Sequence, residues 1–99
     1  MTSVAVLGST GSVGTQTLDV IRARPDHFVV RALGAHSSVD ALAAQAEEFR
    51  PEIVVVVDES AAARLAGRLP AGNELWVGAE ALAAAAERCE VVQIGRAHV

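Results

Sequence analysis

Short runs of β-branched apolar residues alternate along the chain with longer alanine-rich stretches whose apolar positions recur at helical spacing. The strongest run is Ile53 to Val57 (IVVVV), where no polar residue interrupts the apolar ones. An unbroken run of this kind is typical of a strand covered on both faces, as in a parallel sheet between helices. The alternation therefore predicts an α/β fold made of right-handed βαβ units.

The limits of the elements follow from the same pattern. The predicted strands are Ser3 to Leu7, Phe28 to Leu33, Ile53 to Val57, Glu74 to Val77 and Glu90 to Ile94. The predicted helices are Ser12 to about Ala23, Val39 to Phe49, Glu59 to Leu69 and Ala79 to Arg88. Pro25 and Pro51 end the first two helices, and Ser38 is placed to cap the second.

Composition and charge narrow the range of partners. Of the 99 residues 52% are hydrophobic, enough for one packed domain, and the net charge of −4 argues against a nucleic-acid or anionic-membrane partner. All eight basic residues are arginines, so no lysine of this segment can act as a nucleophile, form a Schiff base or serve as a general base. The single cysteine, Cys89, fits a reducing cytoplasm, and no apolar run is long enough to cross a membrane.

A glycine-rich turn, Gly8 to Gly14 (GSTGSVG), joins the first predicted strand to the first predicted helix. Its GxxGxxG spacing is a variant of the dinucleotide-binding fingerprint of Rossmann-like sheets. Gly8 would let the chain reverse, Gly11 would let the backbone approach a pyrophosphate, and Gly14 would let the helix lie close to the strand. The free amides of the helix start would face the phosphates, and the hydroxyls of Ser9, Thr10 and Ser12 would add donors.

The end of the second strand bears on the choice of cofactor. NAD-binding folds usually carry Asp or Glu there to hold the ribose 2′-hydroxyl. This chain has His36, Ser37 and Ser38 instead, and the first acid is Asp40 in the next helix. Because no carboxylate would repel a 2′-phosphate, the loop favours NADP over NAD. A solvated polar loop with a helix cap is the alternative interpretation of the same residues.

The remaining candidates are weaker. Cys89 has no predicted base beside it and is interpreted as a small buried apolar residue. His27 lies in the turn that ends the first helix and is interpreted as a solvated residue. The residue pattern contains no metal-ligand cluster, no catalytic triad and no pair of carboxylates in a catalytic context. The sequence therefore predicts cofactor binding but identifies no catalytic residue and no metal ligand.

The residues of the motif and of the segments after it resemble a known family. The string VLGSTGSVG (residues 6–14), the TLDVI segment (17–21) and the PDHF turn (25–28) closely resemble the start of 1-deoxy-D-xylulose 5-phosphate reductoisomerases. The segments VDALAAQAEEFRP (39–51) and IVVVVDES (53–60) are also similar to that family. The resemblance covers essentially residues 3–93.

The resemblance implies an oxidoreductase of the non-mevalonate isoprenoid pathway. Such an enzyme rearranges and reduces 1-deoxy-D-xylulose 5-phosphate to 2-C-methyl-D-erythritol 4-phosphate with NADPH and a divalent metal, Mg²⁺ or Mn²⁺, usually as a cytoplasmic homodimer. The implied NADPH contacts fall on residues 10–13, which include Val13, and on the loop 36–38. The loop departs from members that have Gly, Lys or Arg, and Asn there. The family's metal ligands and substrate residues would lie further along the chain.

The last six residues, Ile94 to Val99 (IGRAHV), coincide with one reading frame of a common sequencing-adapter oligonucleotide. We expect them to be read-through, which leaves residues 1–93 as an incomplete amino-terminal NADP-binding domain that is inactive by itself. Two alternatives remain open: a fragment of an NADP-dependent semialdehyde or acyl-phosphate dehydrogenase, and a nucleotide-binding module without catalysis. Downstream sequence would separate them, through a catalytic cysteine or through a genuine stop.

Overall fold

The computed structural model describes residues 2–94, and the suspected tail lies outside this range except for Ile94. The elements in chain order are β1 (Thr2–Leu7), α1 (Ser12–Ala23), β2 (Phe28–Ala35), α2 (Val39–Phe49), β3 (Ile53–Val56), α3 (Glu59–Ala66), β4 (Glu74–Val77), α4 (Ala79–Ala86) and β5 (Val91–Ile94). All nine predicted elements form. Their ends differ from the predicted ones by at most three residues, and the largest change is the earlier end of α3, at Ala66 rather than Leu69.

The strands form one parallel sheet in the order β4-β3-β2-β1-β5, which confirms the predicted α/β class. The chain moves stepwise from β1 to β4, and α4 then carries it back across the sheet to pair β5 with β1. The direction of strand addition therefore changes between β1 and β5. In open α/β sheets, ligands bind beyond the carboxyl ends of the strands at such a reversal.

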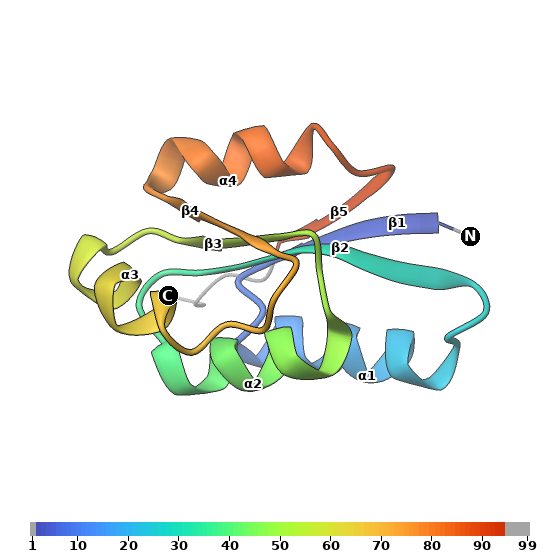
Figure 1. The fold of residues 1–99 in the computed structure, drawn as a ribbon. Helices are drawn as coiled ribbons and strands as arrows, with labels where there is room; N and C mark the ends of the chain where they lie inside the picture. Colours follow the sequence, from blue (N-terminus) through green and yellow to red (C-terminus); the bar gives the residue numbers. More distant parts are fainter. Residues whose placement is uncertain (1, 95–99) are drawn as a thin grey trace.

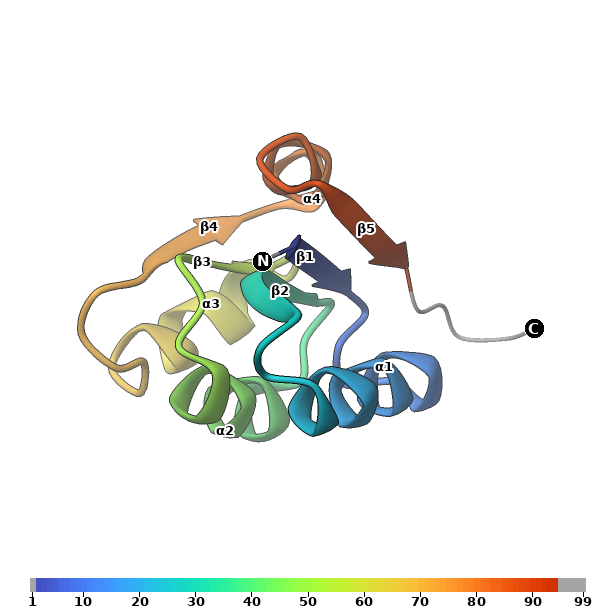
Figure 2. The ribbon, with the colours of Figure 1, turned by 90° about the vertical axis from the view of Figure 1, so that its right-hand side faces the viewer.

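Helices cover the two faces of the sheet unequally. In Figures 1 and 2 α1, α2 and α3 lie on one side of the sheet, and α4 alone lies on the other. The three-helix side holds the larger core cluster, which includes Leu18, Leu33, Leu42 and Leu65. The α4 side is thinner and its buried members are Ala5, Leu7, Ala32, Ile53, Val55 and Ala85.

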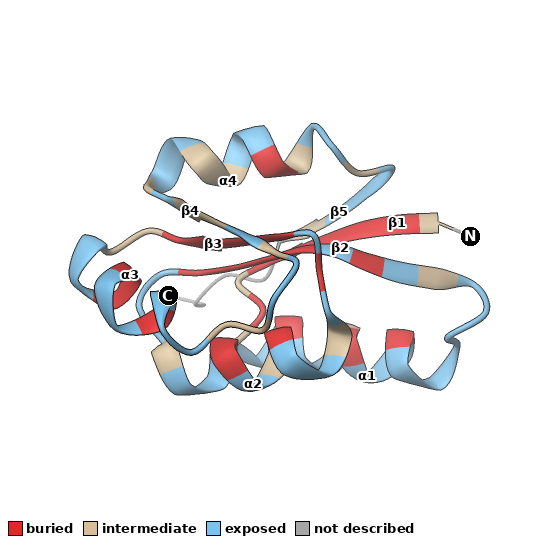
Figure 3. Ribbon diagram, in the orientation of Figure 1, coloured by how far each residue is buried: buried red, intermediate tan, exposed pale blue. Residues whose placement is uncertain are grey.

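Burial follows the arrangement of the sheet. Every residue of β3 is buried, as its unbroken apolar run predicted, and Figure 3 shows the same for most of β1 and for the end of β2. The flanking strands β4 and β5 are more exposed, and Val77 and Val91 remain 44% and 46% exposed. The well-packed centre of the sheet therefore coincides with the strands that precede the two predicted binding loops.

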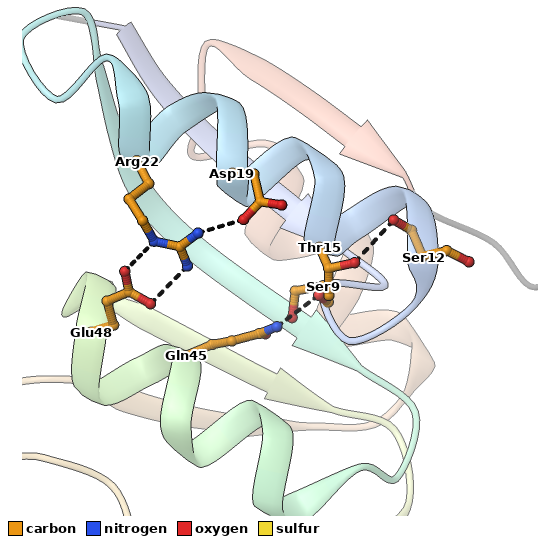
Figure 4. Close-up of polar contacts among 7 residues, drawn as sticks. All are labelled: Ser9, Ser12, Thr15, Asp19, Arg22, Gln45 and Glu48. Atoms are coloured by element: carbon orange, nitrogen blue, oxygen red, sulfur yellow. Dashed lines mark hydrogen bonds and ion pairs between the residues drawn. The ribbon is translucent and has the colours of Figure 1, made fainter.

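An ion-pair network joins α1 to α2 on the outer surface. Arg22 of α1 donates to Glu48 of α2, with 2.8 Å between Nη2 and Oε1, and also donates to Asp19 (Figure 4). The guanidinium also lies over the Phe49 ring, 5.3 Å from its centroid. The hydrogen bond from Arg22 lowers the pKa of the Glu48 carboxyl, so this link persists through neutral pH.

Candidate functional site

The two predicted binding segments meet at the carboxyl ends of adjacent strands. β1 and β2 pair in parallel with Leu7 opposite Gly34, so the glycine-rich turn (residues 8–14) and the 36–38 loop leave the sheet side by side. The N–H groups of Gly8 and Ser9 both donate to the Gly34 carbonyl, at 2.7 and 2.9 Å. The start of the turn is therefore fixed to β2, the strand that leads into the other loop.

The three glycines of the turn differ in why the structure has glycine there. Gly8 has φ 82°, a left-handed conformation that favours glycine, and it allows the predicted reversal. A Cβ on Gly14 would lie 2.2 Å from the Gly8 carbonyl oxygen, which confirms that this residue permits the close approach of α1 to β1. A Cβ on Gly11 would meet only the Gly8 oxygen, at an ordinary 3.5 Å.

The fold therefore requires glycine at positions 8 and 14, but it would accept a side chain at Gly11. Its φ is −82°, a conformation open to any residue, and it is exposed at the N-cap of α1. The space beside its Cα opens to the outside of the turn. A surface without a Cβ at this point is suited to the close approach of a ligand.

The start of α1 offers unused hydrogen-bond donors. Among residues 2–94, the N–H groups of Ser12, Val13 and Gly14 have no acceptor, and the first amide of the helix with a partner is that of Thr15, which donates to Gly11 at 2.9 Å. Ser12 and Val13 are exposed, Val13 by 44%, and Thr10 is half-buried. The expectation that the Ser9 hydroxyl would also face a ligand is wrong, because Ser9 is fully buried. Unpaired amides at the positive end of a helix dipole form a site for an anionic group.

The 36–38 loop is held by its backbone alone. The Asp58 N–H donates to the His36 carbonyl at 2.9 Å, and the Ser38 carbonyl accepts from Leu42 at 3.2 Å. The three side chains are exposed, and Ser38 occupies the N-cap of α2, as predicted, without a side-chain capping bond. Within residues 2–94, no hydrogen bond occupies the side chains of His36, Ser37 and Ser38, so all three can contact a ligand.

The structure adds an acid that the sequence reasoning did not place near this loop. Asp58 follows β3, which pairs with β2, and its backbone contacts His36. The Ser60 hydroxyl donates to its carboxylate at 2.8 Å, and this bond is the main cause of the lowered pKa of Asp58, to which the His36 charge adds. An ionised carboxylate therefore stands beside the loop, although none occupies the end of β2 itself.

Two residues that support the turn were missed as site residues. Gly34 accepts both amides at the start of the turn, and a Cβ there would lie 2.8 Å from Leu82 and 3.1 Å from the Leu7 side chain. Gln45 of α2 donates to the Ser9 carbonyl at 2.8 Å. The available signals were a glycine directly after the predicted end of the second strand and a polar residue on the apolar face of a helix.

No metal site was predicted in this chain, and within residues 2–94 no group of three or more His, Cys, Asp or Glu side chains is placed to hold an ion. The same residues contain no helix long and apolar enough to span a membrane. Cys89 is half-buried, and burial raises the pKa of its thiol above the usual range. The sequence-based interpretation of Cys89 as a small packed residue agrees with this environment.

The sequence profile of the family described as 1-deoxy-D-xylulose 5-phosphate reductoisomerase matches residues 4–99. The chain belongs to this family. A reductoisomerase of Porphyromonas gingivalis is 48% identical over 82 residues, which are 82% of this chain and 21% of the relative. One of Gloeobacter violaceus is 41% identical over an alignment of 100 positions that covers 96% of this chain and 26% of the relative.

Solved reductoisomerases share the fold. The structure of the Zymomonas mobilis enzyme in complex with NADPH superposes with a TM-score of 0.79 at 38% identity, covering 85% of this chain and 22% of that one. A structure of a family member with NADPH, fosmidomycin and magnesium gives 0.80 at 33% identity, covering 95% and 24%. The chain thus corresponds to the amino-terminal region of the reductoisomerases and spans about a quarter or less of the length of these relatives.

Proposed function

We propose that this segment binds NADPH for a reductoisomerase that converts 1-deoxy-D-xylulose 5-phosphate to 2-C-methyl-D-erythritol 4-phosphate. One observation carries the proposal. Unpaired amides at the start of α1 lie beside Gly11, an exposed glycine at a position where the fold itself would accept a side chain. That combination suits a diphosphate at the carboxyl ends of β1 and β2. Family membership and the NADPH-bound relatives support the choice of cofactor.

Within this site each group has a proposed role. The amides of Ser12 and Val13, with the Thr10 and Ser12 hydroxyls, would hold the diphosphate, and Gly11 would let it approach the backbone. The Val13 side chain, 44% exposed, would contact an apolar part of the cofactor. When bound, NADPH supplies the hydride that reduces an aldehyde formed by rearrangement of the sugar phosphate.

We further propose that His36, Ser37 and Ser38 receive the 2′-phosphate and so favour NADPH over NADH. Three exposed polar side chains and the absence of an acid at the end of β2 support this preference. The pKa of the Asp58 carboxyl is lowered, so its negative charge beside His36 weakens the binding of the 2′-phosphate by this loop. Titration of the full-length protein with both cofactors tests the preference, and tighter binding of NADH contradicts it.

The rest of the activity is assigned to residues beyond this segment. We propose that the whole enzyme takes up Mg²⁺ or Mn²⁺ through acidic ligands located there, acts as a cytoplasmic homodimer, and loses activity when reduced to these 99 residues. Family membership and the magnesium-bound relative support the metal. The homodimer and the cytoplasmic location rest on the family resemblance and on the single cysteine.

The decisive experiment follows NADPH oxidation by the full-length protein. We expect the NADPH absorbance to fall only when 1-deoxy-D-xylulose 5-phosphate and a divalent cation are both present. Omission of either, or addition of a chelator, should stop the reaction. NADPH binding without turnover of the sugar phosphate would instead favour a nucleotide-binding module, and a complete gene without a downstream acidic cluster would contradict the metal assignment.

A further inference from the structure

Gln45 connects the second helix to the glycine-rich turn. It lies on α2 next to the buried Ala46, and its Nε2 donates to the Ser9 carbonyl at 2.8 Å, joining residues 36 positions apart. Figure 4 shows the side chain reaching from α2 to Ser9 in the turn. Ser9 is fully buried, so its carbonyl has no access to water and depends on a protein donor.

The orientation of the Ser9 carbonyl sets the orientation of the next amide. Ser9 C=O and Thr10 N–H belong to one planar peptide, and all described peptides are trans, so the two groups point in opposite directions. When Gln45 holds the carbonyl toward α2, the Thr10 N–H points away from α2. The segment 10–12, which leads into the unpaired amides of α1, is therefore oriented by a bond from another helix.

Only the nitrogen of the Gln45 amide group has a hydrogen-bond partner in the described part of the chain. Its Oε1 is buried without a partner in the described part of the chain, as is the Ser9 hydroxyl oxygen. A buried acceptor without a donor costs free energy, and an apolar side chain of similar size would avoid that cost. What Gln45 contributes and an apolar side chain would not is its donor to the turn.

We infer that Gln45 is a positioning residue of the cofactor site, holding the glycine-rich turn in the shape that receives the diphosphate of NADPH. The inference rests on the proposed function, because it assigns a role at the same site. Gln45 acts through Ser9 and does not itself touch the cofactor. A packing role and a donor role for Gln45 predict different effects of an apolar replacement: no loss of affinity for packing alone, and a loss where the donor is needed.

The test compares two substitutions in the full-length protein by titration with NADPH at alkaline pH. Gln45→Glu keeps the size and shape of the side chain but replaces the donor with a carboxylate, and we expect the Kd to rise by about tenfold or more. Gln45→Met removes the donor without adding charge, and we expect a rise of roughly threefold to tenfold. A side chain that only filled space would leave the Kd of Gln45→Met at the wild-type value, because methionine fills the same space without an unpaired polar group.

Controls separate the donor from charge and from folding. Gln16→Glu adds the same charge on the exposed face of α1 and should leave the Kd within about twofold. Thermal unfolding identifies any variant that fails to fold, and Gln45→Met remains informative if Gln45→Glu does so. Wild-type affinity in Gln45→Met, or equal effects of Gln16→Glu and Gln45→Glu, overturns the inference. A wild-type protein that binds no NADPH overturns the proposed function instead.

Discussion

The two loops that follow β1 and β2 leave the same edge of the sheet but are held in different ways. The glycine-rich turn is tied to β2 through Gly34, to α2 through Gln45 and to α1 through the close approach at Gly14. The 36–38 loop is anchored only by backbone bonds, and its side chains are exposed. Substitutions at the tied positions of the turn, such as Gly14, should therefore change the stability and the affinity together, whereas substitutions in the loop should change cofactor choice alone.

The largest effect is expected for Gly14→Ala. The added methyl group would lie 2.2 Å from the Gly8 carbonyl oxygen, so α1 must move away from β1. We expect a loss of about 3 kcal/mol or more in the free energy of unfolding, together with loss of NADPH binding. Chemical denaturation and NADPH titration of the full-length protein measure both.

Gly67→Ala is the matched control for Gly14→Ala, since a Cβ at Gly67 would meet no atom within 4 Å. It should be neutral or stabilising by up to about 1 kcal/mol. Unchanged stability in Gly14→Ala would mean that α1 does not rest on the turn as the structure has it.

Gly11→Ala should separate binding from folding within the same turn. Its Cβ would find only an ordinary 3.5 Å contact, so we expect the unfolding free energy to change by less than about 1 kcal/mol. The methyl group would nevertheless occupy the approach of the diphosphate, and the NADPH Kd should rise about tenfold to a hundredfold. Unchanged affinity in a folded variant would remove Gly11 from the cofactor site.

Ser37→Asp tests the other side of the comparison. The side chain is exposed, so stability should change by less than about 0.5 kcal/mol. A carboxylate beside the 2′-phosphate should raise the NADPH Kd about tenfold and leave the NADH Kd unchanged or lower. Ser37→Asn, of the same size without the charge, is the control. An equal loss for both cofactors would place the 2′-phosphate elsewhere.

The smallest effect is expected for Ser38→Ala. Removal of a capping serine commonly costs about 1 kcal/mol, but Ser38 makes no side-chain capping bond here. The unfolding free energy should therefore fall by less than about 0.5 kcal/mol. Thermal or chemical unfolding checks this value, and a loss of 1 kcal/mol or more would show that the hydroxyl caps α2 in solution.

Much of the fold was predictable because its signals are local. The unbroken apolar run of β3 identified a strand covered on both faces, and Gly8 and Gly14 marked the reversal and the close approach that the structure contains. Element ends were less accurate where local signals were weak. β2 continues through Gly34 and Ala35, beyond its predicted end at Leu33, because pairing with β1 and β3 extends it.

The sequence by itself determined the α/β class and the two loops that follow β1 and β2, since periodicity and glycine spacing are properties of neighbouring residues. Only the tertiary structure decided that Gln45 reaches Ser9, that Gly34 accepts the first amides of the turn, and that Asp58 stands beside His36. These contacts join residues more than twenty positions apart. Strand order and helix packing create them, and no local pattern of side chains encodes either directly.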